Sequence, residues 1–235
     1  MTKFGYGERP GIDISPSEET RAVMPSREWK MKRHKKSWLL GDTIPVGIGQ
    51  GYWTATPMQM VKALTTLINN GKTFTPHFLL YKKSDIINTN QNQPTIDPSK
   101  YVEKNSLVDV NPAYWTLAKE GMHRVMFGAR GTARKVFAGA KYQAAGKSGT
   151  AQVYSLKVNE TYNAHRIPEH LRDHALFIAY APYDKPKIAL AIVLENGGGG
   201  SSNGGAVARK ILDYYLEGIN STELDDGSSN TGHED

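Results

Sequence analysis

Four consecutive residues carry the most reactive set of groups in this sequence: Lys147, Ser148, Gly149 and Thr150, within AAGKSGTAQVY. Two hydroxyls can donate hydrogen bonds to a carboxylate, and the lysine ammonium raises the local electrostatic potential. A strand N–H can point at a developing oxyanion, and glycine lets an incoming backbone come close. The tetrapeptide is therefore a candidate wall of a site for an acyl peptide that ends in a carboxylate.

Strand geometry limits how these side chains act together. Under strict alternation Lys147 and Gly149 point to one face, and Ser148 and Thr150 point to the other. A twist or bulge would be needed to bring all the polar groups to one ligand. The motif is only four letters long, so a strand that begins with ordinary surface residues is the alternative interpretation.

The elements around the tetrapeptide predict helices first and strands later. Thr56-Pro57 and Asn111-Pro112 each offer an N-cap followed by proline at the first helical position. After residue 140, three apolar or β-branched runs predict antiparallel strands, in KSGTAQVYSL, HALFIAYAP and KIALAIVLEN. The segment GGAVARKILDYYLEG predicts a closing helix that ends at Gly218. This order indicates an α+β fold, with about three antiparallel strands packed with several helices and a C-terminal helix.

Helical spacing also predicts which side chains face the core. In the helix after Pro57 they are Met60, Ala63, Leu64, Leu67 and Ile68; in the last helix they are Val207, Ile211, Leu212 and Tyr215. We predict that residues 1–218 form a single domain. Residues 219–235 are polar and acidic, which predicts a disordered tail.

Composition excludes several classes of function. The 235 residues include no cysteine, so disulfides and thiolate metal sites are unavailable. No run of 18 apolar residues could cross a bilayer, and the first residues lack the apolar core of a signal peptide. No cofactor motif is present. His165, His170 and His174 could suggest a metal site, but the lack of carboxylate ligands at a recognisable spacing favours a polar loop.

The formal net charge of +6 is concentrated in residues 27–36, within SREWKMKRHKKSW. Such a segment could bind anionic lipid, nucleic acid or an acidic polymer, and the alternative is a solvated connecting segment. We do not expect nucleic acid as a partner, because neither zinc-finger spacing nor an aromatic RNA-binding signature accompanies the charge.

The chain resembles the penicilloyl-serine transferases, and among them the peptidoglycan D,D-transpeptidases of cell elongation. The resemblance rests on KSGTAQV, the two apolar strands, the glycine-rich turn and the last helix, and on GDTIPVGIGQGYWTATPMQM before them. It implies that residues 1–218 are the C-terminal part of a penicillin-binding/β-lactamase-like transpeptidase domain. It also implies a role in cell shape, periplasmic location with an inner-membrane anchor, and elongation-complex membrane proteins as partners. The implied ligands are peptidoglycan stem peptides and β-lactam antibiotics.

The resemblance implies roles for the tetrapeptide. Lys147 would support the electrostatics and proton traffic of the site. Ser148 and Thr150 would hold the carboxylate of substrate or drug beside Gly149. The Thr150 N–H would provide half of the oxyanion hole.

The sequence departs from the family pattern in one respect. No serine is followed by lysine three positions later, so the S-x-x-K nucleophile is absent from this chain. A literal S-x-N match, Ser201-Ser202-Asn203, follows the K-S-G motif instead of preceding it, and we interpret it as chance. We therefore expect the chain to be inactive alone and its sheet to have an unpaired edge. A non-catalytic peptide-binding fragment and a D,D-carboxypeptidase or β-lactamase are the alternatives.

Overall fold

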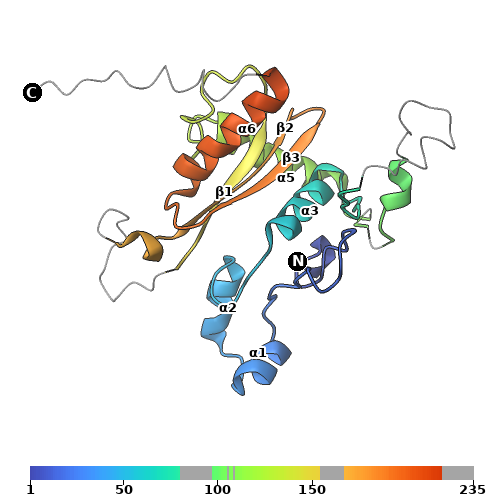
Figure 1. The fold of residues 1–235 in the computed structure, drawn as a ribbon, viewed down its shortest axis with the longest axis vertical. Coiled ribbons are helices and arrows are strands. Elements are labelled where there is room, and N and C mark those ends of the chain that lie inside the picture. The colour runs from blue at the N-terminus through green and yellow to red at the C-terminus, as the bar shows by residue number, and fades with distance from the viewer. Residues whose placement is uncertain (80–96, 105, 108, 154–166, 219–235) are drawn as a thin grey trace, which may run out of the picture. The chain divides into compact units, whose positions relative to one another are not determined.

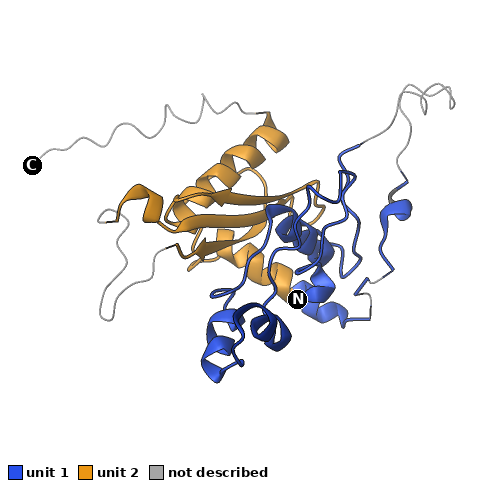
Figure 2. Ribbon diagram, turned by 60° about the horizontal axis from the view of Figure 1, so that its bottom comes forward, with its two compact units in different colours: residues 1–116 blue, residues 117–235 orange. Residues whose placement is uncertain are grey.

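A computed structural model describes residues 1–79, 97–104, 106–107, 109–153 and 167–218. The chain divides into two compact units, Met1–Thr116 and Leu117–Asp235 (Figure 2). The single domain expected over residues 1–218 stays a prediction. The expected disordered tail at 219–235 lies outside the described residues.

Unit 1 consists of short helices joined by irregular chain. Its elements are η1 (Thr2–Phe4), α1 (Arg27–His34), α2 (Leu40–Gly47), α3 (Pro57–Ile68) and η2 (Pro98–Tyr101) (Figure 1).

Helix α3 begins as the sequence predicts. The Thr56 side chain accepts a hydrogen bond from the Gln59 N–H at 3.1 Å, and the Gln59 side chain accepts one from the Thr56 N–H at 2.9 Å. Pro57 occupies the first turn of the helix. The Gln59 amide also donates to the carbonyls of Glu8 and Arg21 at 2.7 and 2.9 Å. Helix α3 therefore holds the irregular N-terminal chain through a buried side chain.

The predicted apolar face of α3 is only partly right. Leu64 is buried, whereas the other four predicted residues are half-buried. The remaining buried side chains of the helix are polar: Gln59, Lys62 and Thr66. Periodicity missed them because their polar atoms are satisfied by hydrogen bonds: Gln59 and Lys62 donate to carbonyls 51 and 52 residues away, and Thr66 donates to the Lys62 carbonyl one turn earlier.

Unit 2 is built around a sheet. Helix α5 (Pro112–Phe127) contains the boundary between the two units, and most of its residues belong to unit 2. The elements that follow are β1 (Ala145–Ala151), η3 (Glu169–Leu171), β2 (His174–Ala181), β3 (Ile188–Leu194), the π-helical turn η4 (Gly200–Gly204) and α6 (Gly205–Glu217) (Figure 1). The strands are antiparallel in the order β1-β2-β3. The predicted fold class, with three antiparallel strands and a closing helix, is confirmed.

The core of unit 2 lies on the face of the sheet that carries Phe177. This side chain is fully buried and pairs across the strands with Ser148 on β1 and Ile192 on β3. Side chains from α5 and α6 join it, among them Met126 and Leu212. The core therefore ties the two helices to the strand next to the K-S-G motif.

The last helix ends at Gly218, as predicted, with φ of 68°. Its buried face carries Ala208 and Leu212, one turn apart. The prediction was wrong for Ile211 and Tyr215, which are exposed. Gly205, the first residue of α6, lies beside the Phe177 ring, so the side of the helix that continues through Ala208 and Leu212 is the buried one.

Candidate functional site

Strand β1 runs through the K-S-G motif without a bulge. Its pairing with β2 is continuous from Ala145 opposite Tyr180 to Ala151 opposite His174. Residues directly opposite in a ladder share a face, so Ser148 and Thr150 lie on the Phe177 face. Lys147 and Gly149 therefore lie on the other face, and the motif's side chains do not gather on one face.

The edge of β1 is where a ligand could touch both faces. In the described part of the chain, β1 has β2 as its only strand partner. An edge strand directs backbone N–H and C=O groups away from the sheet, and an extended peptide can pair with them. Lys147 and Thr150 are exposed there, while Ser148 and Gly149 are half-buried. A peptide added to this edge would have Lys147 on one side of its backbone and the two hydroxyls on the other.

The Lys147 ammonium lies close to the motif's own backbone. Its Nζ donates a hydrogen bond to the Ser148 carbonyl at 2.7 Å. The positive charge is therefore held beside the strand although the side chain is exposed. In this position it can attract an anionic group that reaches the edge of β1.

The glycine-rich turn η4 packs directly on the backbone of the motif. A β-carbon at Gly200 would lie 2.2 Å from the Gly149 carbonyl oxygen and 2.9 Å from that of Leu176. Such distances exclude any side chain at Gly200. The turn therefore supports β1 and β2 at the level of Gly149, a role that sequence reasoning missed although GGGG marked the segment as unusual.

The literal S-x-N match lies in this turn and stabilises the turn itself. The Asn203 side chain donates to the Gly197 carbonyl at 2.5 Å, and the Ser202 hydroxyl donates to the Gly199 carbonyl at 3.4 Å. These contacts fit the interpretation of the match as chance, because the two polar groups serve local backbone.

A buried charged cluster fixes the chain that leads into β1. The Arg209 Nε donates to both carboxylate oxygens of Asp213 at 2.6 Å, and the Tyr142 hydroxyl donates to the same carboxylate at 2.7 Å. Arg209 also donates to the carbonyls of Val136 and Ala138. Burial and the adjacent Asp213 carboxylate raise the pKa of Tyr142. Helix α6 thereby anchors the segment that ends three residues before Ala145.

The histidines near β2 show structural contacts. His174 Nδ1 accepts a hydrogen bond from the Asn196 N–H at 2.8 Å, and the Asn196 amide donates to the carbonyls of His170 and Arg172. His165 lies outside the described residues. Over the part of the chain that is described, no group of three His, Cys, Asp or Glu side chains could hold a metal ion. Within the same part, no helix is long and apolar enough to cross a membrane.

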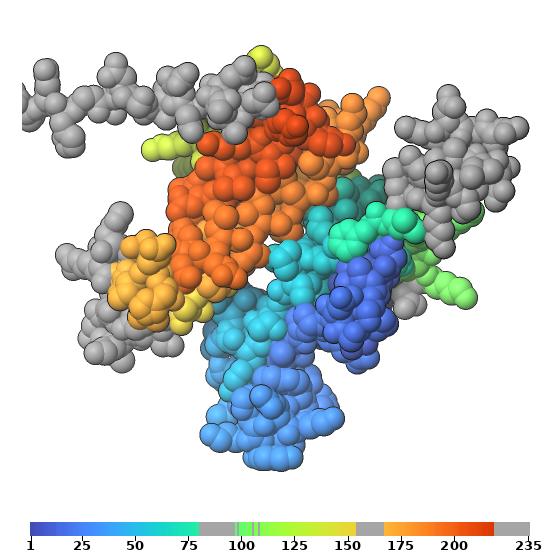
Figure 3. All heavy atoms as spheres, in the orientation of Figure 1, coloured from blue at the N-terminus to red at the C-terminus, as the bar shows by residue number. Residues whose placement is uncertain are grey.

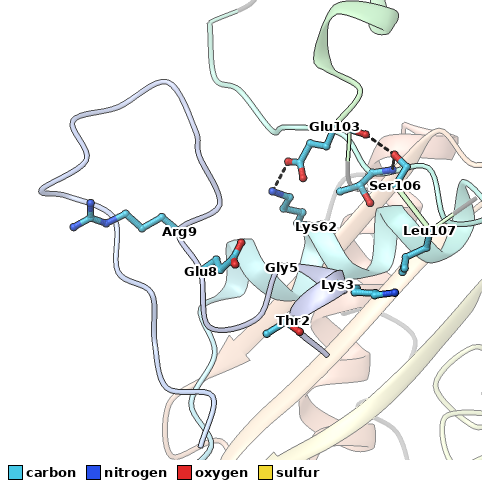
Figure 4. A pocket seen from close by; sticks show the side chains of 10 residues that line it. Thr2, Lys3, Gly5, Glu8, Arg9, Lys62, Glu103, Ser106 and Leu107 are labelled. Carbon is cyan, nitrogen blue, oxygen red and sulfur yellow. Dashed lines mark hydrogen bonds and ion pairs between the residues drawn. The ribbon is translucent and has the colours of Figure 1, made fainter. Parts of the chain in front are cut away.

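Unit 1 has a polar cavity of about 390 Å³. Ten residues line it: Thr2, Lys3, Gly5, Glu8, Arg9, Lys62, Thr73, Glu103, Ser106 and Leu107 (Figure 4). Its buried lysine, Lys62, pairs with Glu103 at 2.5 Å and donates to the Pro10 carbonyl at 3.0 Å. These contacts join α3 to the surrounding loops, so the buried charge of this cavity has a structural role.

Comparison with known proteins shows what the chain is similar to. The model of the penicillin-binding protein transpeptidase domain matches residues 1–213. The peptidoglycan D,D-transpeptidase MrdA of Escherichia coli strain K12 is 52% identical over 224 residues, which cover 95% of this chain and 34% of that protein. MrdA of Haemophilus influenzae strain Rd is 53% identical over 216 residues, covering 92% of this chain and 32% of that protein. The chain spans about a third of the length of these relatives.

Solved structures agree with the sequence comparison. PBP2 of Pseudomonas aeruginosa, in complex with WCK 5153, has a TM-score of 0.71 at 38% identity, covering 92% of this chain and 42% of that one. PBP2 of Helicobacter pylori, in complex with MreC, has a TM-score of 0.70 at 32% identity, covering 93% of this chain and 35% of that one. The resemblance stated from the sequence is confirmed, and the chain belongs to the family of penicillin-binding protein transpeptidase domains.

Proposed function

We propose that this chain supplies the K-S-G wall of a peptidoglycan D,D-transpeptidase that binds penicillin and cross-links stem peptides. The observation that carries the proposal is the edge of β1 that has no strand partner in the described part of the chain, where Lys147 and Thr150 are exposed within a match to the transpeptidase family. A substrate peptide or a β-lactam would lie along this edge as an added strand.

Each residue of the motif has a role in this proposal. Ser148 and Thr150 hold the carboxylate of the substrate or drug, and Gly149 lets the backbone approach. Lys147 supplies positive charge and takes part in proton transfer. The Thr150 N–H donates to the oxyanion that forms when the carbonyl is attacked. No cofactor is needed for acyl transfer of this kind.

The nucleophile is the group that the motif does not supply. Acyl transfer through a serine needs an activating base within hydrogen-bond reach of the hydroxyl. No serine in the sequence is followed by lysine three positions later. We propose that the nucleophile belongs to a part of the transpeptidase domain outside this chain, so that the chain alone is not acylated.

The cellular role follows from the relatives. The MrdA proteins named above are peptidoglycan D,D-transpeptidases, and PBP2 of Helicobacter pylori forms a complex with MreC. We propose that the protein acts in cell elongation and cell shape, with its transpeptidase domain in the periplasm and an anchor in the inner membrane. Its partners would then be membrane proteins of the elongation complex.

A second candidate is a non-catalytic module that binds peptides through the same edge. The absence of an S-x-x-K motif from the sequence favours it over a D,D-carboxypeptidase or β-lactamase, because those enzymes need the serine as well.

Labelling with a fluorescent penicillin tests the proposal. The purified chain should show no covalent adduct after denaturation. A chimera of Escherichia coli MrdA that carries residues 1–218 of this chain should be labelled, at a serine outside those residues. An adduct on any serine of this chain would overturn the assignment of the nucleophile, and an unlabelled, folded chimera would favour the peptide-binding module.

A further inference from the structure

His174 lies at the end of the sheet where β1 finishes and β2 begins. It is the first residue of β2 and pairs across the strands with Ala151, the last residue of β1. Its Nδ1 accepts a hydrogen bond from the Asn196 N–H at 2.8 Å. An imidazole nitrogen accepts only when it carries no proton, so this contact requires the proton of the neutral ring to be on Nε2. The roles proposed for the K-S-G motif make no use of this histidine.

Asn196 belongs to the segment between β3 and η4, residues 195–199. Its backbone has φ of 55°, in the left-handed region that asparagine adopts more readily than most residues. Its side-chain amide donates to the carbonyls of His170 and Arg172 at 3.1 and 2.9 Å. Figure 3 shows the chain that leads into β2, in gold, directly beside the orange chain that follows β3. Both the backbone and the side chain of Asn196 therefore hold this segment to the start of β2.

Asp173, the residue before His174, ties the same segment to the end of β1. Its side chain is buried, and its Oδ1 accepts a hydrogen bond from the Val153 N–H at 3.1 Å, two residues beyond the last residue of β1. Its carbonyl accepts a hydrogen bond from the Gly198 N–H at 2.8 Å. Asp173 and His174 together therefore fix the segment 195–199 against both β1 and β2.

The segment 195–199 continues into η4, which packs on the motif. The Asn203 side chain donates to the Gly197 carbonyl, so the turn is closed onto that segment. Gly200 lies so close to the Gly149 carbonyl that no β-carbon fits between them. That carbonyl and the Thr150 N–H belong to one peptide group, which is planar and trans, so the two point in opposite directions. A shift of the turn against the carbonyl would therefore also change the direction of the N–H that we assign to the oxyanion.

We propose that His174 is a positioning residue for the oxyanion donor, the Thr150 N–H. Its ring acts through Asn196 and the glycine-rich turn, which hold the peptide group between Gly149 and Thr150 in one orientation while the carbonyl of the substrate or β-lactam is attacked. A donor aimed at the oxyanion stabilises the transition state more than the bound ground state, so His174 should affect the rate of acylation more than the binding of the drug. The proposal rests on the proposed function, because the oxyanion forms only if the chain supplies the K-S-G wall of a transpeptidase.

Penicillin acylation kinetics of the MrdA chimera that carries residues 1–218 test this role. His174→Leu removes the acceptor and should lower the acylation rate constant by about tenfold, while the dissociation constant of the noncovalent penicillin complex changes by less than about twofold. His174→Asn should keep the rate constant within about twofold of the unchanged chimera, because Oδ1 of asparagine and Nδ1 of histidine are both bonded to Cγ and can accept from a similar position. His170→Leu is the matched control: His170 is exposed and meets Asn196 through its backbone carbonyl, so the rate constant should not change.

Hydrogen exchange in the purified chain follows the contact itself. The amides of Asn196 and Gly198 should exchange more than about tenfold faster in His174→Leu than in the unchanged chain, and at nearly the unchanged rate in His174→Asn. The amide of Ile178, at the middle of the central strand β2, is the internal reference for an intact sheet. His174→Gln moves the acceptor one bond farther from the backbone; it should also lower the acylation rate constant, and it replaces His174→Leu if that variant does not fold.

Four results would overturn the role of His174 while the K-S-G wall stands. They are an unchanged acylation rate constant in His174→Leu, equal losses in His174→Leu and His174→Asn, a loss confined to the dissociation constant or to thermal unfolding, and unchanged exchange of the Asn196 and Gly198 amides in His174→Leu. A chimera that folds but is not labelled by penicillin, with or without a change at His174, would overturn the proposed function and this role with it.

Discussion

The sheet of unit 2 and helix α2 of unit 1 place their apolar side chains in opposite ways. In the sheet, Phe177 is fully buried against helices of the same unit. In α2, Leu40 and Ile44 face solvent while Asp42 faces inward. The comparison teaches that the strand with the K-S-G motif is supported from within its unit, whereas the apolar side chains of α2 have no such support among the described residues.

The largest loss of stability is expected when the side chain at the centre of the sheet's core is removed. Phe177→Ala should destabilise unit 2 by about 3–5 kcal/mol, through lost burial and a cavity. Hydrogen exchange of the β2 amides measures the loss. Phe78→Ala, a change at an exposed phenylalanine, should alter stability by less than about 0.5 kcal/mol. Equal losses of stability from the two changes would show that Phe177 is not at the centre of the core.

The support of the motif by the glycine-rich turn is tested next. Gly200→Ala should destabilise the sheet by about 1–3 kcal/mol, because the added methyl would overlap the Gly149 carbonyl. Gly205→Ala is the matched control: its β-carbon would lie 3.4 Å from the Phe177 ring, an ordinary contact. Urea unfolding of both variants, followed by circular dichroism, provides the comparison. A loss at Gly205 as large as that at Gly200 would contradict the role assigned to the turn.

The cluster of Arg209, Asp213 and Tyr142 should contribute less to the free energy of unfolding, and its contribution should depend on pH. Tyr142→Phe removes a hydrogen bond to a buried carboxylate, and we expect a loss of about 1–2 kcal/mol at neutral pH. The pKa of Tyr142 is raised in the folded state, so its stabilising effect is present below the tyrosine pKa of the unfolded chain and is lost as pH rises further. The difference in the free energy of unfolding between the unchanged chain and Tyr142→Phe should therefore shrink above about pH 10. A difference that grows with pH in thermal unfolding would contradict the sign of this shift.

Changes at the exposed apolar side chains of α2 should have the smallest effect on the stability of the chain. Leu40→Asp should change the free energy of unfolding by less than about 0.5 kcal/mol, since the side chain is already in water. All four tryptophans lie in unit 1, at positions 29, 38, 53 and 115. Tryptophan fluorescence during urea unfolding therefore reports on the unit that contains α2. A loss above about 2 kcal/mol would mean that the leucine is buried in solution.

Much of the fold follows from local signals in the sequence. The caps at Thr56 and Gly218 and the three strand runs predict elements that the structure confirms. Buried polar contacts were missed, because Gln59, Lys62 and Asp213 depend on partners distant in sequence. The outward face of α2 was missed for the same reason, since the partner of Asp42 lies on another helix.

The position of the K-S-G motif on a strand was predictable from the sequence, whereas the geometry of its side chains was less so. The K-S-G motif lies on a strand, as expected, and its pairing shows no bulge. Strict alternation therefore separates Lys147 from the two hydroxyls, and the edge of β1 is where they can meet one ligand. The support from Gly200 was not predictable, because it depends on how close two backbones approach in the folded chain.

The measurement that tests the central claim most directly is the rate of penicillin acylation of the MrdA chimera that carries residues 1–218. Lys147→Ala in the chimera should lower this rate by about 100-fold, because the charge beside the β1 edge would be lost where the drug carboxylate and the oxyanion develop. Lys185→Ala, which removes an exposed lysine between β2 and β3, should leave the rate unchanged. Equal rates for the two variants would contradict the assignment of the K-S-G strand as a wall of the active site.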